Sequence, residues 1–130
     1  MHNIEDCIFC KIANKKIPAE IIKETGNFIV IKDINPVAPV HLLIISKKHY
    51  DSLIDGVVDT GEHISGENCG EGAGAGWNEI FYLIARLARE LKLDDKGFRT
   101  VINTGADGGQ TVGHLHIHFM AGRQFGWPPG

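Results

Sequence analysis

The stretch His114-Leu115-His116-Ile117-His118-Phe119 decides the fold class of this 130-residue chain. Three histidines recur at every second position, with large apolar residues between them. In a β-strand alternate side chains share a face, so the histidines are predicted to line one surface while the apolar residues bury the opposite one. On a helix the same side chains would scatter. Because histidine is a nucleophile, a proton carrier and a metal ligand near neutral pH, the row indicates chemistry rather than packing alone.

The composition is that of one globular domain, small enough for pairing with a second copy to add stability. Its 13 basic and 16 acidic side chains give a formal net charge of -3 without a long basic run, so neither nucleic acid nor a membrane surface is an expected partner. The apolar runs are far shorter than a bilayer span, and the first residues do not resemble an export signal. The chain has 3 cysteines, an odd number that fits a reducing compartment better than a disulfide framework. A cytoplasmic location is therefore expected.

Apolar patterning predicts a mostly β chain with one long helix. The expected elements are a short helix or turn over 8–12, an extended segment over 21–23, buried strands over 28–31 and 42–45, a helix from Trp77 to Leu91, and strands over 98–104 and 114–120. Prolines mark a loop at 33–39, between the two buried strands.

The segment from 56 to 76 has no convincing periodicity of either kind. Seven of its 21 residues are glycine, and it contains the third cysteine, Cys69. Long irregular segments of this kind are usually surface loops, so we expect a mobile surface loop here. A lid over a ligand is the alternative.

The residues immediately before the histidine row are of the types that bind an anionic oxygen. From Asn103 to Gly113 the chain is rich in glycine, and Gln110 and Thr111 add neutral hydrogen-bond donors. Glycines let the backbone approach a phosphate closely. Taken alone, Gly108-Gly109 equally fits an ordinary hairpin turn. Beside three histidines, a phosphate held by this loop would place its phosphorus over the strand face, where one imidazole can attack it.

A metal site competes for the same imidazoles. His-x-His on a strand offers two ligands for a catalytic zinc. Cys7-x-x-Cys10 is half of a structural zinc site, which two histidines such as His49 and one end of the row would complete. Alternatively, Cys7 and Cys10 are simply small buried residues.

The whole segment 109–120, Gly-Gln-Thr-Val-Gly-His-Leu-His-Ile-His-Phe-Met, resembles the signature of the histidine-triad (HIT) nucleotide-binding family. Further matches in order and spacing, at 9–12, 17–19, 33–36, 38–49 and 123–130, look like its HINT branch, and the closing Trp127-Pro128-Pro129-Gly130 is the most branch-specific piece. The resemblance implies an α+β fold: one HIT domain over 1–130, with an antiparallel sheet of about five strands, one long helix and a short N-terminal helix. It also implies a twofold homodimer in which the tail 123–130 reaches toward the partner's active site.

The resemblance further implies a purine nucleoside phosphoramidase, which cleaves the P–N bond of AMP-amine or GMP-amine compounds through a nucleotidyl-histidine intermediate. His116 would be the nucleophile, flanked by His114, His118 and His41. Implied substrate contacts are Asn103, Gln110 and Thr111 to the phosphate, Asp33 to the ribose, Ile8, Phe9 and Ile34 to the base, and Val112 and Trp127 as further contacts. The reaction requires no metal, while relatives with the cysteine pair hold a structural zinc on residues matching Cys7, Cys10, His49 and His114.

Two other functions stay open. A nucleotide-binding sensor or interaction scaffold would keep the triad with little turnover, and a zinc hydrolase would use the histidine row as metal ligands. The chain departs from the family pattern in two places. The segment 56–76 is richer in glycine than the expected acidic connector, which leaves the start of the long helix open, and Gly113 stands where relatives often carry a larger residue.

Overall fold

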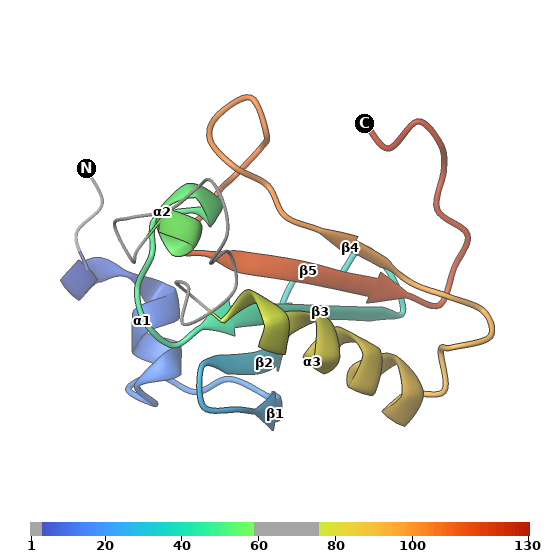
Figure 1. Ribbon diagram of the computed structural model, residues 1–130, viewed down its shortest axis with the longest axis horizontal. Coiled ribbons are helices and arrows are strands. Elements are labelled where there is room, and N and C mark those ends of the chain that lie inside the picture. The colour runs from blue at the N-terminus through green and yellow to red at the C-terminus, as the bar shows by residue number, and fades with distance from the viewer. Residues whose placement is uncertain (1–3, 59–75) are drawn as a thin grey trace.

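The computed structural model of the protein describes residues 4–58 and 76–130 (Figure 1). Its elements in chain order are a 3-10 turn η1 (Ile4–Asp6), α1 (Ile8–Ala13), β1 (Ile21–Glu24), β2 (Phe28–Lys32), β3 (Val40–Ser46), α2 (Leu53–Val58), α3 (Trp77–Glu90), β4 (Arg99–Val101) and β5 (His116–Ala121). The strands form one antiparallel sheet in the order β1-β2-β3-β5-β4. The predicted α+β class and five-stranded antiparallel sheet are therefore confirmed.

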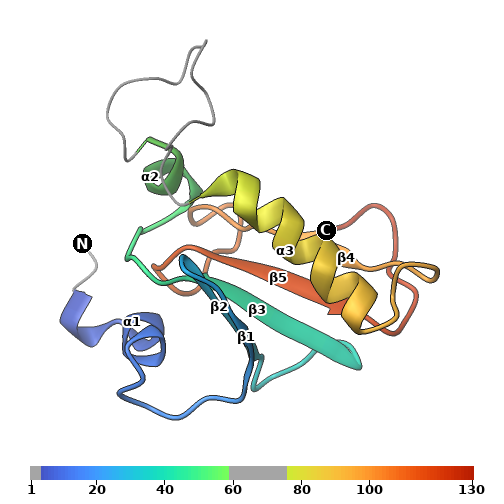
Figure 2. The ribbon, with the colours of Figure 1, turned by 60° about the horizontal axis from the view of Figure 1, so that its bottom comes forward.

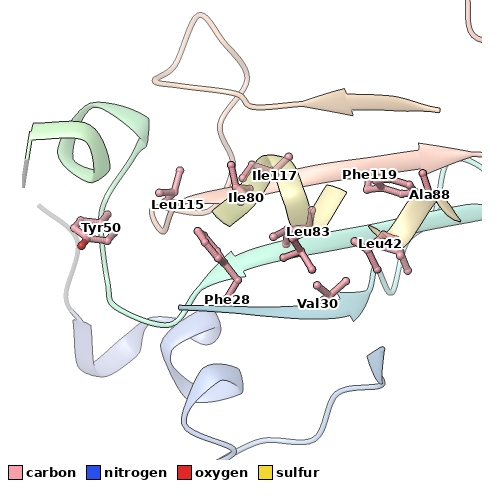
Figure 3. Packing of buried hydrophobic residues seen from close by; sticks show 12 residues of the cluster. Phe28, Val30, Leu42, Tyr50, Ile80, Leu83, Ala88, Leu115, Ile117 and Phe119 are labelled. Atoms are coloured by element: carbon pink, nitrogen blue, oxygen red, sulfur yellow. The ribbon is translucent and has the colours of Figure 1, made fainter. Parts of the chain in front are cut away.

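Helix α3 lies across one face of the sheet (Figure 2). Its buried residues Ile80, Leu83, Leu87 and Ala88 recur at helical spacing, which gives the helix one apolar side. They pack against alternate residues of the central strands, which include Phe28, Val30, Leu42, Ile44, Leu115, Ile117 and Phe119 (Figure 3). The prediction that the residues between the histidines are buried is thus confirmed. Each such side chain contributes roughly 1.5–3 kcal/mol when fully buried.

The opposite face of the sheet is covered only in part, by α1 and the turn before it. Cys7, Phe9, Cys10 and Ile12 pack there against Ile29, Ile31, Leu43 and Ile45. Because side chains alternate along a strand, His41 on β3 shares this face with Leu43 and Ile45. His116 and His118 pair with Ile45 and Leu43 across the β3–β5 ladder, so they lie on the same face. The sheet therefore presents its histidines on the side that α1 leaves partly open.

Three elements differ from the sequence-based predictions. The last strand starts at His116 rather than 114, because the chain bends at His114, whose N–H bonds to the carbonyl of Val112 at 2.8 Å. The strand predicted over 98–104 is limited to β4, whose three residues pair with Met120, Phe119 and His118. Helix α2 was not predicted and takes in residues 56–58, so the loop expected over 56–76 is wrong at its start.

Residues 59–75, most of that expected loop, lie outside the described residues, as does Cys69. Helix α3 begins at Trp77 after Gly76, whose φ of +82° is a conformation that glycine adopts without strain. The start of the long helix, left open by the sequence, is therefore fixed at this glycine. Of the helices that the structure describes, none combines the length and the apolar character that a membrane crossing requires.

Candidate active site and metal-binding cluster

A cavity of about 270 Å³ opens beside α1, on the face of the sheet that carries the histidines. His116 and His118 line it, together with Asp33 from the loop between β2 and β3. The other lining residues are Ile8, Phe9, Ile12, Ile31, Lys32, Ile34, Asn35, Leu43, Thr111 and Val112. The lining thus combines apolar side chains with an aspartate and two histidines.

His116 is oriented by a hydrogen bond at one of its two ring nitrogens. It is 6% exposed, and its Nδ1 lies 2.7 Å from the carbonyl oxygen of His114. A carbonyl only accepts, so Nδ1 carries the proton and Nε2 of the neutral ring carries the lone pair. The edge of Phe9 packs against the His116 ring, with the ring centroids 5.0 Å apart. His116 is therefore a neutral imidazole with a fixed orientation, the form that a nucleophile requires.

His118 is held in the opposite tautomer by His41. The N–H of Val37 donates to Nδ1 of His41 at 3.1 Å, so the proton of the neutral His41 ring is on Nε2. That Nε2 lies 2.9 Å from Nδ1 of His118, which must then accept and leave its own proton on Nε2. The rings of His116 and His118 are 5.1 Å apart. The cavity therefore holds an imidazole lone pair beside an imidazole N–H.

Asp33 connects this histidine chain to the loop between β2 and β3. Its Oδ1 accepts the N–H of Asn35 at 2.8 Å, and its Oδ2 lies 3.3 Å from Nε2 of His41. Asp33 also lines the cavity. Asp33 thus stabilises the turn and supplies acceptor oxygens at the cavity wall.

Burial sets the protonation of both cavity histidines. Desolvation lowers the pKa of His116 below its ordinary value of 6.5, opposed by the hydrogen bond to His114 and by the charge of Asp33. The pKa of His118 is lowered for the same first reason, and then by the charges of His116 and His41. Both rings are therefore neutral at pH 7, which is the state that the tautomer assignment describes.

Hydrogen bonds of the Gln110 side chain hold the glycine-rich loop before His116. The Gln110 side chain accepts the N–H of Gly105 at 3.0 Å and donates to the carbonyls of Asp51 and Val112 at 2.7 and 3.0 Å. Gly108 lies so close to Thr104 that a built Cβ would be 2.4 Å from its carbonyl oxygen. Gln110 therefore supports the loop, and the residues of this loop that reach the cavity are Thr111 and Val112.

Two other predicted contacts lie away from the cavity wall. Asn103 is half-buried where the chain leaves β4, and Trp127 is 82% exposed on the C-terminal tail. Neither residue is among the lining residues of this cavity. The contacts predicted for Asp33, Ile8, Phe9, Ile34, Thr111 and Val112 all fall on that lining.

His114 belongs to a second cluster, with the two cysteines of α1 and its N-cap. The ligand atoms of Cys7, Cys10, His49 and His114 all lie within 4.8 Å of one another. Three of the four separations between sulfur and Nδ1 are 3.1 to 3.5 Å, and the two Nδ1 atoms are 3.1 Å apart. Ligand atoms of a tetrahedral zinc are about 3.3 to 3.8 Å apart, given Zn–N of about 2.0 Å and Zn–S of about 2.3 Å. The four atoms are thus spaced nearly as a zinc ion would require.

The hydrogen bonds behind the two imidazoles also fit a metal. Nε2 of His114 lies 2.7 Å from the carbonyl oxygen of Ser46, and Nε2 of His49 lies 2.8 Å from a carboxylate oxygen of Asp51. Each Nε2 therefore carries the proton of a neutral ring, and both Nδ1 lone pairs face the cysteines. In the protein alone, burial and then the hydrogen bond and charge of Cys7 raise the pKa of Cys10 to about 12. A divalent cation would reverse that effect by binding thiolates.

Sequence reasoning missed several residues that the fold places at these two sites. Leu43 and Ile31 line the cavity because their side chains lie on the same face of the sheet as the histidines. The alternation of residues along each strand carries this signal. Ser46 and Asp51 orient the imidazoles of the cluster. The spacing His49-x-Asp51 is visible in the sequence, whereas the carbonyl of Ser46 carries no sequence signal.

The fold and the site together define a protein with a histidine row on an open α+β sheet, and comparison with known proteins places the chain within a family. The model of the HIT domain matches residues 14–125, so the chain belongs to the HIT domain family. Protein HitA of Neisseria gonorrhoeae is 42% identical over 117 residues, which cover 90% of this chain and 96% of HitA.

Solved structures agree with this assignment. A histidine triad protein from Clostridium difficile has a TM-score of 0.78 and 40% identity, covering 97% of each chain. A HIT family hydrolase from Legionella pneumophila has a TM-score of 0.79 and 38% identity, covering 96% of this chain and all of its own. A histidine triad family protein from Mycobacterium smegmatis, described as zinc-bound, has a TM-score of 0.69 and 34% identity, covering 98% and 82%.

Proposed function

We propose that the protein is a nucleoside phosphoramidase, which hydrolyses the P–N bond of a purine nucleoside 5'-phosphoramidate. One observation carries the proposal: within one cavity, His116 presents an imidazole lone pair beside the N–H of His118. A nucleophile next to a hydrogen-bond donor suits attack on phosphorus, where negative charge develops on oxygen. The name of the Legionella relative, a HIT family hydrolase, supports a hydrolytic reaction.

The reaction follows from these two tautomers. Nε2 of His116 attacks phosphorus, the P–N bond breaks, and the amine leaves with a proton on its nitrogen. His114's carbonyl stabilises the positive charge that forms on the His116 ring, because it accepts the Nδ1 proton. The N–H of His118 bonds the phosphoryl group. Water then cleaves the phosphorus–histidine bond and releases the nucleoside monophosphate and two protons, which replace the two that the amine took from solvent as it left as an ammonium ion.

The cavity supplies a distinct environment for each part of a nucleotide. Apolar side chains of Ile8, Phe9 and Ile34 suit a purine ring, and Asp33 can accept hydrogen bonds from both hydroxyls of a ribose. Thr111 and Val112 lie at the end of the glycine-rich loop, near the expected phosphate. Asn103 and Gln110 are predicted phosphate contacts of the same loop, although Gln110 must give up one of its internal bonds to serve as one.

The test is a steady-state assay with an adenosine 5'-phosphoramidate that carries a fluorescent amine. We expect release of the amine and AMP by the wild type, and accumulation of an acid-labile nucleotidyl-protein in rapid-quench samples. An His116→Ala variant that binds AMP and does not cleave supports the proposal. If the wild type binds AMP without cleavage, the alternative of a nucleotide-binding sensor or scaffold replaces it.

We also propose a structural zinc on Cys7, Cys10, His49 and His114. The spacing of the four ligand atoms and the acceptors behind both imidazoles support it, as does the zinc-bound relative from Mycobacterium smegmatis. A bound zinc would crosslink α1 to the start of β5, and it supplies no step of the P–N cleavage. Metal analysis of the purified protein, before and after chelation, tests this.

A twofold homodimer is the proposed assembly. Phe81 and Tyr82 on α3 are 70% and 75% exposed, and β4 is an edge strand of the sheet. Large exposed apolar residues beside an open edge suit a self-complementary interface, and in a dimer the tail with Trp127 could reach the partner's cavity. Light scattering should give twice the chain mass for the wild type and for Lys16→Glu on the α1 side, and the monomer mass for Phe81→Glu.

One observation supports the alternative hypothesis of a catalytic zinc hydrolase. Asp33, His41 and His118 also bring ligand atoms within 4.8 Å of one another. The hydrogen bond between His41 and His118, and the carboxylate of Asp33 at 3.3 Å from His41, account for their positions without a cation. Chelation separates the two mechanisms. P–N cleavage by the fully chelated, folded protein favours His116 as nucleophile. Loss of activity on chelation, with recovery when zinc is added to protein that stayed folded, favours the zinc hydrolase.

A further inference from the structure

The chain that follows β5 passes directly over the loop between β2 and β3. Gly122 has a φ of +96°, and a Cβ built on it would lie 2.8 Å from Cβ of Pro39. Only glycine allows so close an approach in that conformation. The next residue, Arg123, therefore lies against the same loop, and its Nε donates a 2.9 Å hydrogen bond to the carbonyl of Val37.

This loop has little side-chain packing to hold it. Ile34 and Val37 are 88% and 56% exposed. A second cavity, of about 270 Å³, is lined by Pro36, Pro39 and His41, so side chains do not fill the space next to the loop. Hydrogen bonds must therefore fix the position of Val37, and Arg123 supplies one from outside the loop.

Arg123 is itself ordered by its neighbours. Its guanidinium carbon lies 4.3 Å from the centroid of the Phe125 ring, and Nη1 donates to the carbonyl of Gln124 at 3.1 Å. A guanidinium stacked on an aromatic ring loses part of its rotamer freedom, so its Nε is held in the direction of Val37.

We infer that Arg123 is a positioning residue that sets the tautomer of His41 through Val37. Arg123 fixes the carbonyl of Val37, and the N–H of the same residue donates to Nδ1 of His41. That bond keeps the proton of His41 on Nε2, facing His118. With Val37 released, His41 can carry its proton on Nδ1 instead, and His118 then loses the Nε2 proton that it presents to the phosphoryl group.

The catalytic part of this inference rests on the proposed function, but the tautomer can be measured without turnover. Two-bond proton–nitrogen NMR spectra of 15N-labelled protein distinguish a protonated from an unprotonated ring nitrogen. In the wild type, Nδ1 of His41 should appear unprotonated and Nε2 protonated. In Arg123→Ala both nitrogens should move toward the average of a tautomer mixture, and Arg123→Lys should move them less.

Arg99 provides the matched control. It also lies over the Phe125 ring, at 5.2 Å, and its Nη2 donates to the tail carbonyl of Gly126 at 2.9 Å. Arg99→Ala thus removes the same charge and a second anchor of the tail, while the Arg123–Val37 bond stays. If Arg123 acts through Val37, Arg99→Ala keeps the His41 signals of the wild type.

In the phosphoramidate assay, Arg123→Ala should lower kcat by about tenfold and change KM by less than about twofold, since the loss of one hydrogen bond to a charged group is of that order. Equal effects of the two alanine variants on the His41 signals overturn the inference in favour of general tail order, as does an Arg123→Ala spectrum identical to the wild type. If the wild type does not cleave, the proposed function fails while the NMR comparison still decides the role of Arg123.

Discussion

His114 and His116 stand two residues apart in one repeated motif, yet the fold gives them different surroundings. His114 is fully buried, and its Nδ1 faces two thiols and another imidazole. His116 lines a cavity, and its Nδ1 bonds to a backbone carbonyl. The difference comes from the backbone: the chain bends at His114 and becomes regular strand only at His116. One motif thus contributes its first histidine to the cluster proposed to bind zinc and the other two to the cavity proposed for the reaction.

His114 links the two regions. The ring of His114 belongs to the cysteine cluster, while its carbonyl fixes the tautomer of His116. A cluster that anchors His114 therefore also holds His116, the proposed nucleophile, in place. Substitutions in the cysteine–histidine cluster should therefore destabilise the protein. Substitutions in the cavity should stop the reaction and leave the fold intact.

The sharpest test of that separation is His116→Ala. We expect kcat for the phosphoramidate to fall by about 10⁴-fold or more, because a covalent mechanism has no substitute for its nucleophile. AMP affinity and the melting temperature should stay close to those of the wild type, since the ring bonds only to one carbonyl. Isothermal titration and circular dichroism provide these controls. Residual turnover within tenfold of the wild type would exclude His116 as the nucleophile.

Cys10→Ser should show the reverse of the His116→Ala result, with a large loss of stability and a smaller loss of activity. Serine keeps the size of the side chain and leaves Cys7 as the N-cap of α1, but it removes a zinc ligand. At a free zinc concentration of about 1,000 times Kd, the wild type should gain about 4 kcal/mol in free energy of unfolding, and the variant should lose most of that gain. Chemical denaturation with and without zinc measures it.

The third cysteine provides a control for that experiment. Cys69→Ser should respond to zinc as the wild type does. In Cys10→Ser, kcat should fall by less than about 100-fold, as expected when a catalytic group is loosened rather than removed. Equal stability of Cys10→Ser and the wild type in zinc would contradict the assignment of this cluster as a metal site.

Asp33→Asn tests the cavity alone, with a smaller effect. The amide oxygen of asparagine can still accept the N–H of Asn35, so the turn should persist. Loss of the carboxylate should raise KM for the ribonucleoside substrate by about tenfold, the effect of one charge-assisted hydrogen bond. The 2'-deoxyribonucleoside substrate is the comparison, because its KM should change less. An unchanged ratio between the two substrates would remove Asp33 from ribose recognition.

Much of this fold follows from local pattern. The apolar runs at 28–31 and 42–45 and the helical spacing after Trp77 place β2, β3 and α3, because those segments bury a continuous apolar surface. Helix α2 has no such pattern, and it was not predicted. The strand predicted over 98–104 is mostly loop, because only three of its residues find a partner on β5.

The site divides in a similar way. The alternation of histidines identified the face of the sheet that carries the cavity, and the resemblance to the HIT family supplied some of the residues that line it. The bend at His114 could not be predicted, because it involves a hydrogen bond from the N–H of His114 to the carbonyl of Val112, and a backbone bond of this kind carries no sequence signal. The support that Gln110 gives its loop depends on the carbonyls of Asp51 and Val112, and backbone positions leave no mark in a sequence.

The pH dependence of the reaction is the finest test of the cavity. Burial lowers the pKa of His116 and His118 below 6.5, so both stay neutral as the pH falls through 6.5. Attack requires neutral His116, and the acid limb of kcat/KM should therefore have its midpoint below that value. Asp33 acts in the opposite direction, because its negative charge favours the protonated rings. Asp33→Asn should thus move the midpoint to still lower pH, and a shift to higher pH would contradict this role of the Asp33 charge. A wild-type midpoint above 6.5 would show that burial does not control these histidines.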